Sequence, residues 1–148
     1  MDKREEIIEL AKNFFKEKAK HFYLDMAFLY GSWSRGFPRQ DSDIDIAIVF
    51  AKEPPSEDEV FNIITAISLD LTKRTGLEVN VIPIYQDFQK PMLYYNAIVL
   101  GLPIFVSNPD RYIDLRNEAI HQMEDFSIFG VGWQLAVAES NLEELTHA

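Results

Sequence analysis

Hydrophobic positions recur along the chain with two different periods. Over residues 3–22 the apolar side chains lie three and four positions apart, which predicts an amphipathic helix with one buried face. Four short runs of apolar and β-branched residues predict strands, at 27–30, 44–50, 77–84 and 103–106. Helical patterns follow the later runs, at 56–74, 87–100 and 108–124. Because short strands alternate with helices, the pattern predicts a layered α/β domain.

The last part of the chain is unusually apolar. Gly130 and Gly132 interrupt the helical pattern, so we expect a break there and a last helix over 133–145. The segment 126–137, FSIFGVGWQLAV, either packs in the core or forms a surface for a partner or a second copy. We therefore divide the chain into a main domain, residues 1–125, and a C-terminal helical extension, residues 126–148, which packs on that domain or forms an interface.

Composition narrows the functional classes. The 148 residues carry 24 Asp and Glu against 14 Lys and Arg, a net charge of −10, which argues against bulk binding to nucleic acid. The absence of cysteine excludes disulfides, thiolate catalysis and Cys-based metal sites. No apolar run approaches the roughly 20 residues that cross a bilayer. We expect a cytoplasmic protein that does not enter a membrane.

A glycine–serine turn follows the first predicted strand. Gly31 tolerates backbone angles that other residues resist, and Ser32 is a good first residue for a helix. A strand, a Gly-Ser turn and a helix start leave backbone N–H groups free at a positive dipole end, which favours phosphate. The Ser32 hydroxyl and the Arg35 guanidinium add donors for phosphate oxygens. Trp33, inside the same segment, either stacks on a base or covers the underside of the loop.

An aspartate pair opens the next predicted strand. Asp43 and Asp45 are two residues apart, so their carboxylates point to the same face of a strand. Two like charges this close are unfavourable unless a cation lies between them, and Mg²⁺ prefers carboxylate and phosphate oxygens. Either feature alone is more often structural. Together they indicate metal-assisted transfer from a nucleoside triphosphate.

The segment GSWSRGFPRQDSDIDIAIVF resembles the signature of the DNA polymerase β-type nucleotidyltransferases, in their minimal (MNT) branch. The pattern G-S-x10-D-x-D is matched without a gap, from Gly31 to Asp45. The resemblance implies an α/β (α+β) fold with a short mixed sheet flanked by helices. It also implies that Gly31 and Ser32 bind the triphosphate, beside the donor expected at Arg35, and that Asp43 and Asp45 hold two Mg²⁺ ions.

The third acid of this family, which normally lies on a neighbouring strand, is not where the pattern expects it. The aligned position is Asn80, and Glu78 lies two residues before it on the same face. Glu78 either takes over as catalytic residue and metal ligand, or the site is weakened. Asn80 can ligate a metal through its amide oxygen but cannot accept a proton as a base.

The resemblance implies a nucleotidyltransferase that moves a nucleoside monophosphate from a Mg²⁺-bound triphosphate, with ATP as first choice, to an acceptor hydroxyl. Members of the minimal branch often act as antitoxins beside HEPN-domain toxins, so the expected acceptor is a partner protein. The alternative is a catalytically impaired antitoxin that neutralises a HEPN toxin by binding alone. A homodimer through residues 126–137 is a further expectation.

Overall fold

The computed structural model describes residues 2–36 and 42–147, with the backbone alone given for 127–137 and 144–147. Four strands form one sheet in the order β3-β2-β1-β4. They are β1 (Leu24–Tyr30), β2 (Ile44–Phe50), β3 (Val79–Pro83) and β4 (Leu102–Val106). β1 pairs antiparallel with β2 and β4, and β2 pairs parallel with β3. The predicted mixed sheet is therefore confirmed.

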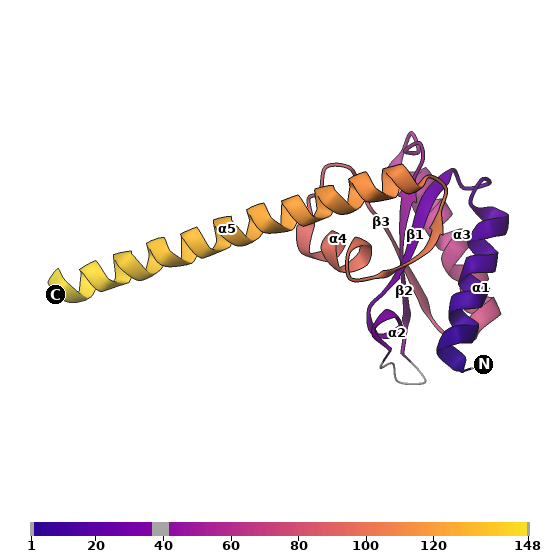
Figure 1. The fold of residues 1–148 in the computed structure, drawn as a ribbon, viewed down its shortest axis with the longest axis horizontal. Coiled ribbons are helices and arrows are strands. Elements are labelled where there is room, and N and C mark those ends of the chain that lie inside the picture. Colours follow the sequence, from indigo (N-terminus) through magenta and orange to yellow (C-terminus); the bar gives the residue numbers. More distant parts are fainter. Residues whose placement is uncertain (1, 37–41, 148) are drawn as a thin grey trace.

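The helices cover both faces of this sheet. They are α1 (Lys3–Lys18), α2 (Ser32–Arg35), α3 (Glu57–Thr75), α4 (Pro91–Ile98) and α5 (Pro109–His147). Figure 1 shows α1 and α3 on one side of the sheet, and α4 with the first part of α5 on the other. The predicted limits of α3 are confirmed, because Ser56 accepts a hydrogen bond from the Glu59 N–H and Gly76 ends the helix with φ 74°.

The alternation of side chains along β2 separates the two halves of the core. Ile44, Ile46 and Ile48 are buried against α1 and α3. Ala47 and Val49 point to the opposite face, where they pack with α4 and the start of α5. Asp45 has the parity of Ala47 and Val49, so it belongs to the face that α4 and α5 cover.

A buried carboxylate ties the first strand to the last helix. Asp25 lies where the β1–β2 register shifts, and the residue is only 5% exposed. One carboxylate oxygen accepts a hydrogen bond from the Ser107 hydroxyl, and the other is paired with the Arg111 guanidinium. The Ser107 N–H also donates to the Asp25 carbonyl at 2.9 Å. This network fixes the start of α5 against the edge of the sheet.

Helix α5 differs from the expectation at its middle. The break expected at Gly130 and Gly132 is wrong, because the helix continues from Pro109 to His147. Figure 1 shows its second half extending away from the sheet and the other helices. The side chains of the apolar segment 127–137 lie outside the described residues, so its role as an interface stays a prediction. Among the described residues no helix is long and apolar enough to span a bilayer.

The Asp25 network predicts a stability difference between two arginines of α5. Replacing Arg111 with Ala leaves the buried carboxylate without its cation, so we expect a loss of about 1–3 kcal/mol in the free energy of unfolding. Arg116→Ala, at an exposed position of the same helix, is the matched control and should change stability little. Chemical denaturation of both variants measures this, and equal stabilities would show that the ion pair contributes nothing.

Candidate functional site

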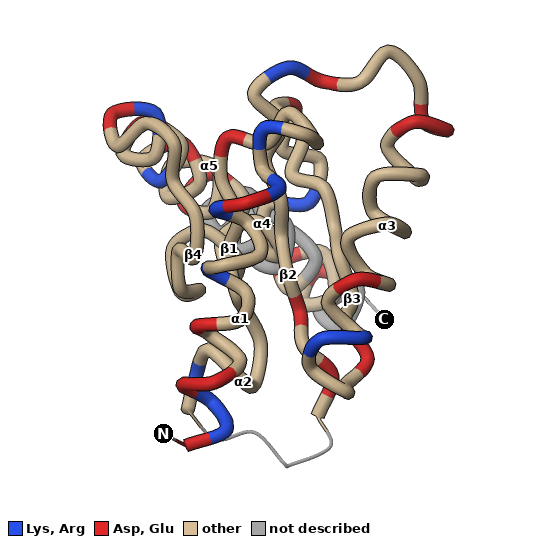
Figure 2. Tube along the Cα trace, turned by 90° about the vertical axis from the view of Figure 1, so that its right-hand side faces the viewer, with Lys and Arg blue, Asp and Glu red and all other residues tan. Residues whose placement is uncertain are grey.

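The candidate site lies where β1 ends and where β2 and β3 begin. Tyr30 of β1 is opposite Asp45 in the antiparallel pair, and Asp45 is opposite Asn80 in the parallel pair. Three neighbouring strands therefore contribute one row of side chains across the sheet. Red Asp and Glu positions lie close to the β2 and β3 labels in Figure 2. The sheet register alone brings these residues together, although 15 and 35 positions separate them in sequence.

Gly31 makes the turn that leaves β1 and enters α2. Its backbone angles, φ 76° and ψ −153°, belong to a region that only glycine occupies readily. A Cβ atom at this position would lie 2.5 Å from Oδ2 of Asp45, closer than any real contact. The turn therefore needs glycine for two reasons: its backbone angles and the closeness of the Asp45 carboxylate.

Hydrogen bonds from Trp33 and Arg4 position the start of α2. Trp33 is 2% exposed, and its indole N–H donates to the Ser42 carbonyl at 2.9 Å. Of the two interpretations of Trp33, the structure supports the one in which it covers the underside of the loop. Arg4 of α1 donates to the carbonyl oxygens of Trp33 and Ser34, at 2.7 and 3.1 Å.

Arg4 is a supporting residue that the sequence did not reveal. It lies 29 positions before Trp33, in a helix whose charged residues look like an ordinary solvated face. No local pattern marks it as different from the neighbouring lysines. Its two hydrogen bonds give the Gly31–Arg35 segment a fixed position relative to α1, and Arg35 itself is exposed.

Asn80 is the residue of β3 that contacts the aspartate pair. Its side-chain amide donates to Oδ2 of Asp43 at 3.5 Å and to Oδ1 of Asp45 at 3.3 Å. The amide nitrogen faces the two carboxylates because they can only accept hydrogen bonds when ionised. Glu78 is exposed just before β3, where its backbone carbonyl accepts from the Ile44 N–H at 2.9 Å.

The electrostatic environment of Asp45 is unfavourable to its charge. Burial raises the pKa of Asp45, the hydrogen bond from Asn80 lowers it, and the neighbouring Asp43 carboxylate raises it. Burial and the charge of Asp45 also raise the pKa of Tyr30 to about 12. A cation beside Asp45 would relieve both effects, because an opposite charge favours the ionised carboxylate.

The donor set fits a hard divalent cation. Two carboxylates and an amide group lie together, and all three can supply oxygen ligands of the kind that Mg²⁺ takes. Among the side chains that the structure describes, no three Asp, Glu, His or Cys residues gather in a metal-binding arrangement. The site therefore offers two charges, and any third ligand from β3 at Asn80 is neutral.

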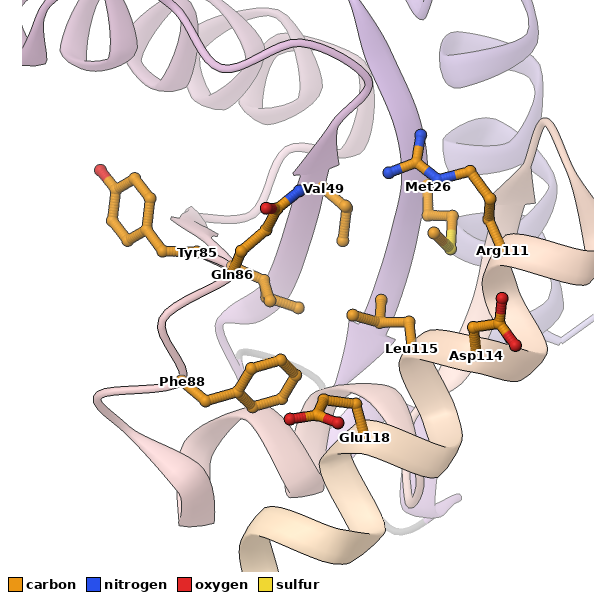
Figure 3. A pocket seen from close by; sticks show the side chains of 10 residues that line it. Met26, Val49, Tyr85, Gln86, Phe88, Arg111, Asp114, Leu115 and Glu118 are labelled. Carbon is orange, nitrogen blue, oxygen red and sulfur yellow. The ribbon is translucent and has the colours of Figure 1, made fainter.

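A separate cavity of about 360 Å³ opens on the same face of the sheet. It is lined by the apolar side chains of Val49 in β2, Phe88 and Leu115, and by the charged side chains of Arg111 and Glu118 in α5 (Figure 3). Val49 is four residues beyond Asp45, which places the cavity about 13 Å farther along the strand. Arg111 of this cavity is paired with Asp25 and not with the residues around Asp45, so the cavity is separate from the candidate site.

Known proteins resemble the chain in sequence pattern and fold. Residues 6–110 match the family described as Polymerase beta, Nucleotidyltransferase. No curated protein matches the chain in sequence.

Among solved structures, a toxin–antitoxin with AMP-PNP is 16% identical, with a TM-score of 0.66 over 85% of this chain and 97% of the other. A mutant MntA–HpeT toxin–antitoxin is 14% identical, with the same TM-score and coverage. A tri-AMPylated Shewanella oneidensis HEPN toxin in complex with an MNT antitoxin is 15% identical, with a TM-score of 0.61 over 88% and 98%.

The raised pKa of Asp45 predicts how stability depends on pH. Because its pKa is higher in the folded chain than in the unfolded chain, ionised Asp45 destabilises the fold as the pH rises through the folded value. In metal-free buffer, Asp45→Asn should therefore melt at a higher temperature than the wild type at pH 7. The difference should vanish below the ordinary pKa of a carboxyl group.

Thermal melts in EDTA between pH 3 and pH 8 measure this difference. Asp70→Asn is a suitable control, because Asp70 makes only an exposed pair with Arg74 on the surface of α3. A fall in the melting temperature of Asp45→Asn at neutral pH would show that Asp45 is a structural residue.

Proposed function

Because the chain belongs to the polymerase β-type nucleotidyltransferase family, we propose that it transfers a nucleoside monophosphate from a nucleoside triphosphate to a hydroxyl group of a partner protein. The observation that carries the proposal is the closeness of Gly31, Asp45 and Asn80. The Gly31 turn lies so close to the Asp45 carboxylate that a Cβ atom would be 2.5 Å from its Oδ2, and the Asn80 amide donates to the same carboxylate. Phosphates and a divalent cation are the ligands that such a pair of features attracts.

The residues of the turn and the two aspartates have different roles in this proposal. Gly31 lets the backbone of the loop approach the triphosphate, and the Ser32 hydroxyl and Arg35 guanidinium add donors for its oxygens. Asp43 and Asp45 hold Mg²⁺. When bound, Mg²⁺ polarises the phosphoryl oxygens and favours ionisation of the attacking hydroxyl.

The transfer exchanges one bond for another at the α-phosphorus. The acceptor oxygen forms a bond to that phosphorus, the bond to the bridging oxygen breaks, and pyrophosphate leaves. The proton of the acceptor passes to solvent, with the exposed Glu78 as the candidate carrier. Asn80 cannot take this proton, because an amide has no basic lone pair at neutral pH.

The similar structures support a protein as acceptor and ATP as donor. One contains AMP-PNP, and another contains a HEPN toxin that is AMPylated and bound to an MNT antitoxin. A third is a mutant in which two aspartates, two positions apart, are replaced by glutamates. By analogy we infer that this chain is an antitoxin whose partner is a HEPN-domain toxin and that it works in the cytoplasm.

One observation favours a second function, neutralisation by binding alone. The third position of the site is Asn80, which brings neither charge nor a base. The long projecting helix α5 would then provide the contact, through the apolar segment 126–137, with the partner or with a second copy of this chain. Transfer of label to the partner separates the two functions.

The nucleotide-binding role of the turn predicts different effects at two glycines. Gly31→Ala should weaken ATP binding at least about tenfold, because its Cβ displaces the Asp45 carboxylate, and should destabilise the fold by about 1–3 kcal/mol. Gly36 also has a positive φ, of 85°, but nothing lies within 4 Å of a Cβ there. Gly36→Ala should therefore bind ATP like the wild type.

Ser32→Ala provides a graded comparison in the same titration. One hydrogen bond to a charged group contributes about 1.5–3 kcal/mol, so we expect a loss of about tenfold to a hundredfold in affinity. Isothermal titration with ATP and Mg²⁺ measures all three variants. If Gly31→Ala and the wild type bind ATP equally, the turn does not hold the phosphates.

The proposed reaction predicts a labelled partner. Incubating the chain with α-labelled ATP, Mg²⁺ and a purified HEPN-domain partner should place label on the partner and release pyrophosphate. The double variant Asp43→Asn, Asp45→Asn should lower the rate at least about a hundredfold, since it removes both metal-binding charges. A stable complex that forms without any label on the partner would favour neutralisation by binding alone.

A further inference from the structure

We propose that Asn80 makes this a one-cation site. Its amide donates hydrogen bonds to both aspartates in the metal-free protein. Because Asn80 carries no negative charge, the site binds only the cation that arrives with the nucleotide. The proposal rests on the proposed function for the identity of the nucleotide. It goes further by assigning a role to the residue that stands in the place of an acid.

The first step concerns the metal-free protein. Asp43 and Asp45 point to the same face, and the amide nitrogen of Asn80 lies within hydrogen-bond distance of an oxygen of each, at 3.5 and 3.3 Å. Donation to both carboxylates reduces their mutual repulsion, in the same place where a cation would do so. An acid at position 80 would instead add a third negative charge to the cluster.

The second step concerns the number of cations. Two divalent ions within about 4 Å of each other repel strongly and need bridging anions between them. Asp43 and Asp45 supply two negative charges, and the part of the chain that the structure describes adds no third acid to them. The two aspartates can hold the cation bound to a triphosphate, but a second cation near the acceptor lacks a charged ligand from β3.

The third step concerns the consequence for turnover. The cation beside the acceptor and a carboxylate base both serve to remove the proton of the attacking hydroxyl. With Asn80 in this position β3 supplies neither of them, and the proton leaves only through solvent and the exposed Glu78, so the chain binds the nucleotide–metal complex and transfers slowly. Asn80 is therefore a positioning residue that favours the nucleotide-bound state over turnover.

Counting bound manganese tests the proposal directly. The protein is titrated with Mn²⁺ in saturating α,β-methylene-ATP, which cannot release pyrophosphate, and free Mn²⁺ is followed by electron paramagnetic resonance. We expect one Mn²⁺ per chain for the wild type and two for Asn80→Asp. Two Mn²⁺ ions in the wild type, or one in Asn80→Asp, would overturn the proposal.

Melting temperatures in EDTA, without nucleotide, test the role of the amide. Asn80→Ala should melt below the wild type, and Asn80→Asp should melt lower still because it adds repulsion. Asn62→Asp, at an exposed position of α3, is the control for adding one charge to an acidic protein. If Asn80→Asp melts no lower than Asn62→Asp, the amide does not hold the aspartates and the proposal fails.

Two further outcomes keep the proposal separate from the proposed function. If neither protein binds the nucleotide analogue, the proposed function fails, while the melts in EDTA still decide the role of the amide. If Asn80→Asp is unfolded in EDTA, its recovery on addition of Mn²⁺ supports the proposal and a failure to recover contradicts it. In the transfer assay Asn80→Asp should be at least about tenfold faster than the wild type.

Discussion

The register of β2 with its two neighbours is the constraint on which the candidate site depends. Asp45 stands between Tyr30 and Asn80 only because β1 and β3 pair with β2 at these offsets. A slip of one residue would turn Asp45 towards α1 and α3 and would bring Ile44 to the site. Burial of Ile44 and the other isoleucines of β2 opposes that slip, so the hydrophobic core fixes the position of the carboxylates.

The sequence predicted what depends on short-range geometry. The period of two along a strand put Asp43 and Asp45 on one face, and the glycine after an apolar run predicted a turn whose angles the structure confirms at Gly31. The choice between Glu78 and Asn80 required more. Both have the same parity, and only the offset between β3 and β2, which the crossover through α3 determines, places Asn80 opposite Asp45.

What the sequence did not predict depends on contacts between distant segments. Arg4 holds the loop after β1, and Asp25 holds the start of α5, yet neither differs locally from a surface residue. The break expected at Gly130 failed for a related reason. A glycine inside a helix lowers the stability of the helix by only about 1 kcal/mol relative to alanine. A helix that already extends on both sides tolerates this cost, because a break would require a second nucleation.

The repulsion between the Asp43 and Asp45 carboxylates can be reduced in two ways. In the free protein Asn80 donates to both carboxylates, and under the proposed function a cation that arrives with the nucleotide would take that place. A cation that binds the two aspartates would force the Asn80 amide to give up its hydrogen bonds or to turn its oxygen towards the cation. This cost would make a bare cation bind more weakly than a cation that brings phosphates. The phosphates would accept hydrogen bonds from the turn at Gly31, so the binding of each ligand would favour the binding of the other. Under the proposed function, this geometry therefore favours binding of metal and nucleotide together, whether a partner would then be modified quickly or slowly.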